Sequence, residues 1–390
     1  MAGPPVLILG GGLTALGVLR LLGRRGVDAY VWPPATDFVR HSRWYRTAPV
    51  PADAAGDDLP GLLDRVGLDR AVLMPVGDSW AMAVAGLDAA RAERFPACVP
   101  PGEVLTKLVN KLAFAELLAR VQVAHPVTVP VARGEDLAGV PEEALARAFL
   151  KPHDSQRFFE RFGVKGWRVA SREEAAARLD QLGAAGLGVV VQEYIPGPPS
   201  EHYFVDGFAD REARIRLLFA RRRLRMYPPD FGNSTRMVSV PLEEVAEGVA
   251  AMRRIVTDLP YRGIFSAEFK RDPRDGRLKL LEVNARPWWY VEFAARCGVD
   301  VVRAYYDEAL GRPGREPESY RVGRELVYPY YDYHALRAEG QRGVAALARW
   351  AWRMIGAVQP VWTLDDPHPA LAALAAQVTG RVTRTGERMA

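Results

Sequence analysis

Cysteine is scarce in this sequence, and its scarcity excludes several kinds of site. The two cysteines, Cys98 and Cys297, are far apart and have no metal-binding spacing. The six histidines are scattered and form no metal pair. Low cysteine usage is typical of proteins from a reducing cytosol, so we predict a cytoplasmic protein. No nucleophile signature surrounds either cysteine, so no covalent catalyst is evident.

Long apolar runs are also missing. The apolar run Val6–Leu9 has no basic region before it, and glycines and Arg20 interrupt it well before membrane-spanning length. We therefore expect no signal peptide, no transmembrane helix and no membrane partner. Charge of one sign is not in large excess either, because 52 basic and 47 acidic side chains give a net charge of +5. This balance does not indicate a nucleic-acid partner, but it is compatible with anionic ligands such as nucleotides.

The remaining composition is that of an ordinary globular protein, with 49% hydrophobic and 25% charged residues. A chain of 390 residues is too long for one small core and predicts two or three domains. The oligomeric state is left open between a monomer and a homodimer.

The chain opens with the pattern of a β-α-β unit. An apolar strand, a glycine turn, an amphipathic helix and a second strand are predicted over residues 6–9, 10–12, 13–25 and 26–32. A right-handed crossover makes this the start of a parallel sheet. The glycines suggest a dinucleotide fingerprint, but the second strand ends in Trp32 and Pro33 without the ribose-binding acid. Because a glycine turn at a helix start binds any anion, Gly12 is a candidate substrate residue.

Another buried strand, over residues 71–76, is followed by Asp78. The carboxyl end of such a strand is where ligand crevices open in α/β sheets, which makes Asp78 a candidate substrate residue. As the N-cap of the next helix, Asp78 would have a purely structural role. Both interpretations remain open.

Two short alternating runs, over residues 264–270 and 279–287, flank a link rich in turn formers and predict an antiparallel hairpin. A turn near residue 275 places Glu268 opposite or nearly opposite Glu282. Like charges that face each other across a ladder are destabilising, and a divalent cation is the simplest explanation. Asn284 adds an oxygen ligand suited to magnesium. The alternative is that both glutamates lie on a solvated sheet face.

Several further residues have the character of phosphate or nucleotide ligands. Lys111 lies in a helix predicted over residues 106–120, and Lys151 ends an apolar strand just before a proline. Lys151 either binds phosphate or extends to the surface. Residues 157–166 are predicted to form a lid, and they include Lys165. A strand over residues 189–193 then leads into a proline- and glycine-rich hinge, with Glu201 following.

In their order and spacing, these motifs resemble those of the ATP-grasp superfamily, and most closely its carboxylate–amine ligase branch, which includes the D-aspartate ligase-like proteins. The resemblance covers roughly residues 1–310 and implies an α/β ATP-grasp fold. It further implies a Rossmann-like parallel-sheet domain over residues 1–104 and a small lid subdomain over residues 105–195. A subdomain with the metal site follows over residues 196–312, and a mainly helical C-terminal extension over residues 313–390. The extension is expected to pack on the core or to cover the acceptor cleft.

The resemblance also implies a role for each matching residue. Lys111 and Lys151 correspond to the lysines on the ATP phosphates, and Arg286 to the arginine near the transferred phosphate. The hinge that holds adenine corresponds to Gln192, Glu193, Tyr194 and Ile195, and the acid that binds the ribose corresponds to Glu201. The ligands of Mg²⁺ or Mn²⁺ correspond to Glu268, Glu282 and Asn284. One departure is that the region from Lys151 to Lys165 is bulky and charged, whereas the family's covering loop is rich in glycine or serine. Lys165 is the predicted phosphate contact of that region.

These implications predict an ATP-dependent ligase that joins a small carboxylic acid to an amine, such as an amino acid or short peptide, through an acyl phosphate. Arg225 and Ser234 are added as candidate substrate residues. Residues 288–290 are assigned to the core or to a substrate wall. The alternatives are a dinucleotide-dependent oxidoreductase, a non-catalytic nucleotide-binding module and a carboxylase that uses bicarbonate.

Overall fold

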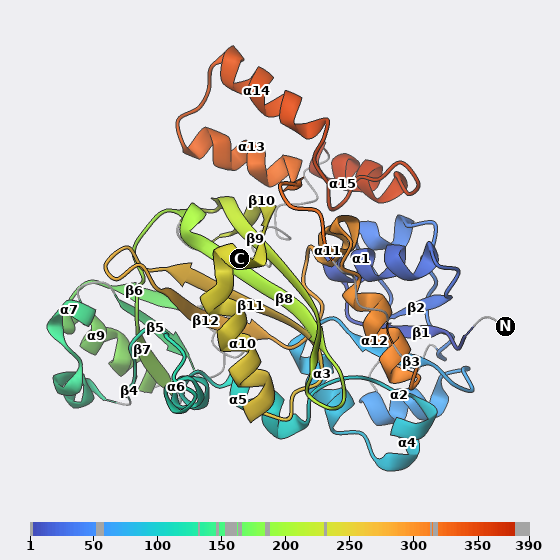
Figure 1. The fold of residues 1–390 in the computed structure, drawn as a ribbon, viewed down its shortest axis with the longest axis horizontal. Coiled ribbons are helices and arrows are strands. Elements are labelled where there is room, and N and C mark those ends of the chain that lie inside the picture. The colour runs from blue at the N-terminus through green and yellow to red at the C-terminus, as the bar shows by residue number, and fades with distance from the viewer. Residues whose placement is uncertain are drawn as a thin grey trace.

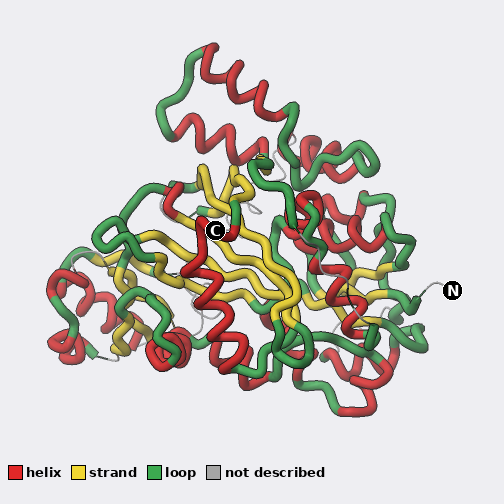
Figure 2. Tube along the Cα trace, viewed as in Figure 1, coloured by secondary structure: helices red, strands yellow, loops and turns green. Residues whose placement is uncertain are grey.

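The computed structural model describes residues 3–51, 58–131, 133–145, 148–152, 162, 166–183, 188–229, 232–312, 314 and 319–378. These residues form three β-sheets with helices packed around them (Figure 1). Figure 2 shows the strands of the largest sheet running through the middle of the molecule. Of the described helices, none is both long enough and apolar enough to cross a membrane.

The N-terminal sheet is parallel, with the strand order β2-β1-β3. All residues of β1 and β3 are buried, as expected for a parallel sheet that is covered on both faces. The predicted β-α-β opening is therefore confirmed. The elements are β1 (Val6–Leu9), α1 (Gly12–Gly23), β2 (Ala29–Trp32), η1 (Phe38–His41), α2 (Leu59–Arg65), β3 (Val72–Pro75), α3 (Asp78–Ala85) and α4 (Ala89–Arg94).

A four-stranded antiparallel sheet follows, with the order β4-β7-β5-β6. It has a small core of its own, which includes Leu137, Leu150, Leu179 and Val191. Strand β5 ends at Lys151 and Pro152, as the sequence predicts. The elements are β4 (Thr128–Val131), η3 (Gly134–Gly139), α7 (Glu142–Leu145), β5 (Ala148–Pro152), β6 (Trp167–Val169), α9 (Arg172–Gly183) and β7 (Val189–Glu193).

The single helix predicted over residues 106–120 is wrong, because the structure has two helices there, α5 (Gly102–Val109) and α6 (Lys111–Arg120). Asn110 separates them. Its side-chain oxygen accepts hydrogen bonds from the backbone amides of Leu112 and Ala113, each at 3.0 Å. A side chain that satisfies the first free amides in this way starts a new helix. Lys111 is consequently the first residue of α6.

The largest sheet has six strands in the order β12-β11-β8-β9-β10-β13. The predicted hairpin is confirmed as β11 and β12, and Glu268 pairs directly with Glu282 in their register. Met252 and Ile255 of α10 are buried in a core that also contains residues of β8 and β11. The elements are η4 (Pro199–Glu201), β8 (His202–Ala209), β9 (Ile215–Tyr227), β10 (Asn233–Val240), η5 (Leu242–Val245), α10 (Ala246–Asp258), β11 (Gly263–Arg271), β12 (Leu278–Asn284) and β13 (Glu325–Val327).

Two helices that follow the large sheet return to the N-terminal sheet. They are α11 (Val291–Cys297) and α12 (Val301–Ala309), and their residues share a hydrophobic core with β1, β3 and α1. The contact with α1 is close, because a Cβ atom on Gly17 would lie 3.0 Å from the Val291 side chain. The N-terminal core therefore draws on residues beyond the first predicted domain. The domain boundaries at residues 104, 195 and 312 stay a prediction.

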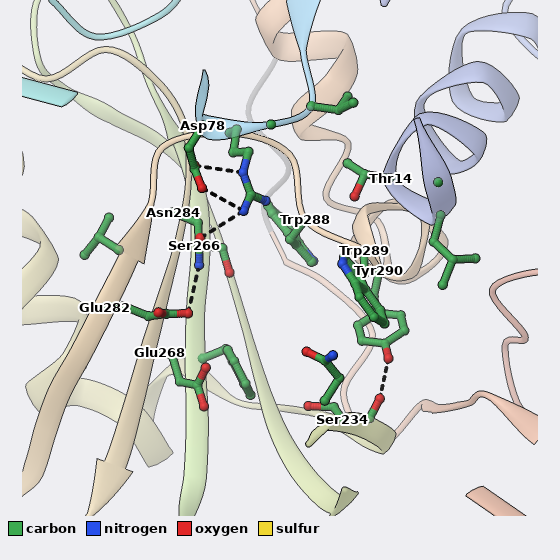
Figure 3. A pocket seen from close by; sticks show the side chains of 18 of the residues that line it. Thr14, Asp78, Ser234, Ser266, Glu268, Glu282, Asn284, Trp288, Trp289 and Tyr290 are labelled. Carbon is green, nitrogen blue, oxygen red and sulfur yellow. Dashed lines mark hydrogen bonds and ion pairs between the residues drawn. The ribbon is translucent and has the colours of Figure 1, made fainter. Parts of the chain in front are cut away.

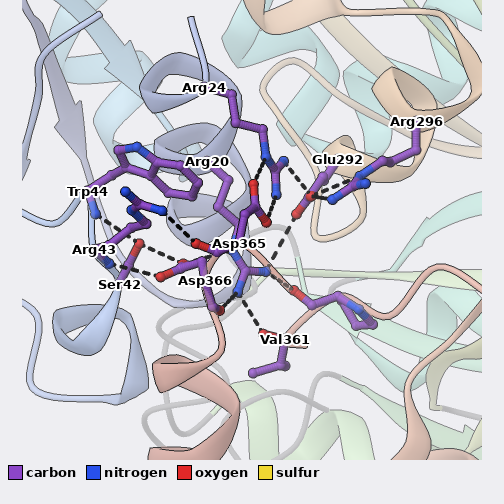
Figure 4. A network of polar contacts seen from close by, with 11 residues as sticks. Arg20, Arg24, Ser42, Arg43, Trp44, Glu292, Arg296, Val361, Asp365 and Asp366 are labelled. Carbon is purple, nitrogen blue, oxygen red and sulfur yellow. Dashed lines mark hydrogen bonds and ion pairs between the residues drawn. The ribbon is translucent and has the colours of Figure 1, made fainter. Parts of the chain in front are cut away.

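The C-terminal part is mainly helical, with α13 (Pro329–Ala338), α14 (Val344–Met354) and α15 (His368–Val378) at one end of the molecule (Figure 1). It is held to α1 by a buried ionic cluster (Figure 4). Arg20 Nε donates to Asp366 Oδ2 at 3.0 Å, and both side chains are fully buried. Asp365 and Asp366 precede the last helix, and their carboxylates pair with Arg24 and Arg20 of α1.

Candidate active site

A cavity of about 600 Å³ opens where the turns after β1 and β3 meet strands β9 to β12 (Figure 3). Both turns lie at the carboxyl ends of parallel strands, where α/β proteins bind ligands. Eight of the predicted site residues line this cavity: Gly12, Asp78, Lys111, Ser234, Glu268, Glu282, Asn284 and Arg286. The fold therefore brings together residues that are up to 274 positions apart, from Gly12 to Arg286.

The two facing glutamates differ in their surroundings. Glu268 Oε1 accepts from Arg223 at 3.0 Å and lies 2.7 Å from His202 Nδ1. Glu282 has a weaker contact, since its Oε1 accepts from Asn284 Nδ2 at 3.3 Å. The contacts with Arg223 and His202 therefore offset part of the repulsion between Glu268 and Glu282. The sequence analysis explains the close approach of these glutamates by a metal ion alone. Three side chains with oxygen ligands remain side by side on β11 and β12, which is a donor set suited to a hard divalent cation.

The protonation of the Glu268 pair follows from burial and charge. Burial alone would raise the pKa of Glu268, but the Arg223 guanidinium and the His202 hydrogen bond hold this pKa well below its usual range. Burial also lowers the pKa of His202 to about 4, and the positive charge of Arg223 acts in the same direction. The pair is therefore a carboxylate next to a neutral imidazole at pH 7.

Arg286 connects the metal strand to the N-terminal sheet. Its guanidinium donates to both carboxylate oxygens of Asp78, at 2.8 and 3.2 Å, and to Asn284 Oδ1 at 3.2 Å (Figure 3). Asp78 is the first residue of α3, and the N-cap residue is Gly77. The N-cap interpretation of Asp78 is therefore wrong, and its side chain instead orients Arg286.

Two lysines with like charge lie beside the carboxylates. Burial lowers the pKa of Lys151 to about 8, and the positive charge of Lys111 lowers it further, while Glu282 and Glu268 oppose this shift. Lysines crowded together in this way favour an anion between them. The third predicted lysine, Lys165, and residues 157–161 and 163–165 of the predicted lid lie outside the described residues.

The predicted hinge residues lie at the end of β7 and just after it. Gln192 Nε2 donates to Thr128 Oγ1 at 3.1 Å, and the side chain of Ile195 is buried. The carboxylate of Glu193 pairs with Arg274 and accepts from the Val127 amide at 3.1 Å. Lys270 of β11 lies over the Tyr194 ring, at 4.7 Å from its centre, and so connects this segment to the large sheet.

Seven of the described site residues are not among those that line the cavity: Lys151, Gln192, Glu193, Tyr194, Ile195, Glu201 and Arg225. Glu201 ends η4, with its carboxylate 3.8 Å from Arg222 and 3.9 Å from Arg271. Arg225, predicted to contact substrate, instead pairs with Asp332 and Glu339 of the C-terminal part, at 3.0 and 2.9 Å. The prediction for Arg225 is therefore wrong in this structure. The register between β9 and β10 is irregular on both sides of Arg236, the residue that pairs with Arg225 in the ladder.

Comparison with known proteins bears on the fold. No family model matches the chain. A D-aspartate ligase from Enterococcus faecium (strain Aus0004) is 24% identical over 242 residues, which make up 60% of this chain and 57% of that protein. The chain thus matches little more than half the length of this relative.

Solved structures resemble the chain over more of its length. The N5-carboxyaminoimidazole synthetase of Staphylococcus aureus, complexed with ADP, has a TM-score of 0.62, 15% identity and coverage of 83% of this chain and 81% of that one. The L-amino acid ligase of Bacillus licheniformis has a TM-score of 0.59, 17% identity and coverage of 80% and 75%. The chain has the ATP-grasp fold. The resemblance predicted from the motifs is confirmed, because these proteins belong to the carboxylate–amine ligase group of that superfamily.

Within the ATP-grasp fold, the sequence analysis overlooked two buried arginines that line the cavity. Arg221 pairs with the buried Asp206 at 2.7 Å, and Arg223 donates to Ser234 Oγ at 2.8 Å as well as to Glu268. The basic run of β9 suggests a solvated face with Arg225 directed inward. The period of two along a strand was the available signal, because it places Arg221 and Arg223 on one face.

The side of the cavity formed by the N-terminal turns and β10 is lined by backbone and aromatic groups. Gly12 has a φ of +69°, and nothing lies within 4 Å of a Cβ built there, so the turn is open toward the cavity. Tyr290 donates its hydroxyl hydrogen to the backbone carbonyl of Ser234. Trp288 and Tyr290 are buried in the hydrophobic core, as the first interpretation predicts, and they also line the cavity, while the substrate wall stays a prediction.

Proposed function

We propose that this protein is an ATP-dependent ligase that forms an amide bond between a small carboxylic acid and an amine. The direct exchange of a carboxylate oxygen for an amine is prohibitive in water, because oxide is a very poor leaving group. Transfer of the ATP γ-phosphate to the carboxylate gives an acyl phosphate, from which the amine displaces phosphate. Such phosphoryl transfer requires positioning and charge neutralisation more than a protein nucleophile.

One observation carries the proposal: a carboxylate pair lines the cavity, and a lysine pair lies beside it. Glu268 and Glu282 face each other on adjacent strands, and Lys111 and Lys151 are close enough to lower the pKa of Lys151. A nucleotide triphosphate with a divalent cation matches both pairs, because its phosphates need the lysines and its cation needs the carboxylates. An oxidoreductase would use neither pair.

Glu268, Glu282 and Asn284 would hold Mg²⁺ or Mn²⁺, and Lys111 and Lys151 would bind the phosphates. When bound, the cation supplies neutralisation of charge between the β- and γ-phosphates. Arg286, fixed by Asp78, would stabilise the negative charge on the transferred phosphoryl group. Gln192, Glu193, Tyr194 and Ile195 would border the adenine, with Glu201 toward the ribose and Lys165 over the phosphates.

The substrates are proposed to be small molecules, with an amino acid or short peptide among them. Gly12, Asp78 and Ser234 lie on the side of the cavity formed by the N-terminal turns and β10, which suits a compact polar substrate. Closure of the small sheet over the nucleotide would keep water from the acyl phosphate. The cytoplasm, which supplies ATP, is the proposed location, as a monomer or homodimer.

The test is a screen for ADP release. The full-length protein with MgATP is incubated with pairs from a set of carboxylic acids and amino acids, and products are identified by mass. The ligase proposal expects ADP release that requires both partners and a product whose mass is that of the pair less one water. ADP release with bicarbonate alone would support a carboxylase, and thermal stabilisation by NAD(P)H but not by MgATP would contradict the proposal.

A further inference from the structure

Exposed apolar side chains are concentrated in the C-terminal part of the molecule. Among the described residues, twelve large hydrophobic side chains are exposed, and eight of them lie between residues 330 and 374. Such clustering marks an interaction surface, whereas single exposed apolar residues are ordinary. Three of the eight, Val344, Trp352 and Ile355, lie on α14 or directly after its last residue. This helix lies outermost at its end of the molecule (Figure 1).

The side chains of α14 fall on two faces. Leu347, Trp350 and Met354 are half-buried, and the indole nitrogen of Trp350 donates to Asp332 of α13 at 3.0 Å. This inner face attaches the helix to the molecule. On the other side, Val344, Ala348, Trp352 and Ile355 follow one another at intervals of four, four and three residues, which places them on one stripe. We call this stripe the outer face of α14.

The outer face is fully open to solvent in the described structure. Val344, Trp352 and Ile355 are 85%, 77% and 77% exposed, respectively. No residue of α14 is buried. An amphipathic helix with a second apolar stripe exposed to this degree has a partner for that stripe in its working state.

The charge around the outer face restricts the partner. From residue 340 to residue 364 the sequence has three arginines, Arg342, Arg349 and Arg353, three tryptophans and no acidic residue. Arg349 and Arg353 are both exposed and lie one turn apart, on the flank of the helix between the outer and inner faces. The matching surface must therefore be apolar within and anionic at its rim.

Two occupants from this chain itself fit poorly. A second copy that paired symmetrically through α14 would bring arginines against arginines, with no acid on the helix to compensate. The C-terminal residues 379–390 carry three arginines against one glutamate, so they have the same sign of charge as the helix. An anionic lipid surface has both required features, because phosphate groups lie directly above an apolar layer.

We propose that α14 docks this protein on the surface of an anionic lipid bilayer, with its outer face at the boundary of headgroups and acyl chains. Trp352, Ile355 and Val344 enter this boundary, and Arg349 and Arg353 contact the lipid phosphates. The helix lies along the surface and does not span the bilayer. This inference is independent of the proposed ligase activity, and it replaces the expectation that no membrane is a partner.

The test is sedimentation of the full-length protein with vesicles of phosphatidylcholine containing 30% phosphatidylglycerol, compared with vesicles of phosphatidylcholine alone. We expect binding to the anionic vesicles, a blue shift of tryptophan emission, and weaker binding as salt is raised. The double variant W352S/I355S should weaken binding by at least about tenfold. R349Q/R353Q should weaken it by about fivefold for each arginine.

The matched control is M82S/V322S, which removes two exposed apolar side chains elsewhere and should bind vesicles as the wild type does. Circular dichroism checks that each variant is folded. Equal binding to neutral and anionic vesicles, or no loss of binding in W352S/I355S, would overturn the proposal. So would light scattering that detects a dimer abolished by W352S/I355S, because a second copy would then be the occupant.

Discussion

Two clusters of buried arginines and carboxylates differ in how completely their charges are satisfied. In the first, Arg20 donates to the Asp366 carboxylate and to the backbone carbonyls of Pro360, Val361 and Asp366. Asp366 in turn accepts from the hydroxyl of Ser42 and the amide of Arg43. This cluster, shown in Figure 4, is closed, because its buried charges have partners within the fold.

The second cluster, at the cavity, is open. Arg223 and His202 satisfy one oxygen of Glu268, but among the described residues Glu282, Lys111 and Lys151 form no ion pair. An open cluster costs stability, because Lys111 and Lys151 repel each other and the nearby glutamates offset this repulsion only in part. The difference teaches that a buried arginine–carboxylate pair alone does not indicate function. Uncompensated charges of both signs, held next to one another, indicate a site that expects a charged ligand.

The largest effect is expected from breaking the open cluster at Glu282. Glu282→Ala removes one proposed metal ligand, and kcat should fall by on the order of 10³- to 10⁴-fold, because several kcal/mol of transition-state stabilisation is lost. ADP release measures this loss. The thermal midpoint should stay at or above that of the wild type, since the change also removes repulsion from Glu268.

The control for Glu282 is Glu212→Ala, an exposed glutamate of the β8–β9 turn that pairs with Arg214. It should retain wild-type ADP release. Wild-type turnover in Glu282→Ala would contradict the metal assignment.

A substitution in the closed cluster should lower the stability of the protein and leave the rate of the chemical step unchanged. Asp366→Ala removes the closer carboxylate partner of the fully buried Arg20 and leaves only Glu292, at 3.5 Å, so the free energy of unfolding should fall by about 3–5 kcal/mol. Denaturant unfolding measures this change.

Asp365→Ala is the matched control for Asp366→Ala. The Asp365 carboxylate also pairs with an arginine of α1, Arg24, but the Asp365 side chain is 41% exposed. Its loss should be no more than about 1 kcal/mol. Equal losses in the two variants would show that the closed cluster does not anchor the C-terminal part.

The lysine pair predicts how kcat/KM for ATP depends on pH. Because the pKa of Lys151 is lowered to about 8, its positive charge is present below that pH and is lost as the pH rises through it. Since kcat/KM for ATP reports the free enzyme, it should fall above pH 8. Lys111→Met removes one cause of the lowered pKa, so the fall should move to higher pH, while kcat/KM at pH 7 drops by about 10- to 100-fold.

The control for the lysine pair is Lys107→Met, an exposed lysine of α5. It should change neither the size of kcat/KM nor its pH profile. A profile of Lys111→Met with the wild-type midpoint would show that Lys151 does not control the alkaline limb.

The parts of the site that the sequence predicts well are local. The hairpin places Glu268 opposite Glu282 because strands alternate with a period of two and a short turn sets their register. The glycine turn before α1 and the strand ending at Lys151 are likewise recognisable within a dozen residues. In each case, the residues that carry the chemistry and the residues that set the geometry are close together in the sequence.

The remainder depends on contacts between distant segments. Asp78 and Arg286 are 208 residues apart, and Arg20 and Asp366 are 346 residues apart, so no local pattern joins them. Arg225 is likewise paired with residues distant in the sequence, Asp332 and Glu339 of the C-terminal part. The positions of these side chains are set by tertiary packing between distant segments.

The smallest effect is expected where the N-terminal sheet orients the open cluster. Asp78→Asn weakens the contacts that fix Arg286, but Asp78 is about half exposed, so water and Asn284 partly replace it. We expect kcat to fall by about three- to tenfold with the KM for ATP unchanged, because Arg286 is retained and only its orientation is loosened.

Steady-state kinetics separates this positioning role from the substrate-binding role that the sequence first suggests for Asp78. If Asp78 bound the amine, Asp78→Asn would raise the KM for the amine and leave kcat with saturating substrate near the wild-type value. Arg286→Lys is the companion variant, since lysine keeps the charge but loses the two-pronged contact with Asp78. If Asp78 acts through Arg286, adding Asp78→Asn to Arg286→Lys should cost little more, because the contact is already broken.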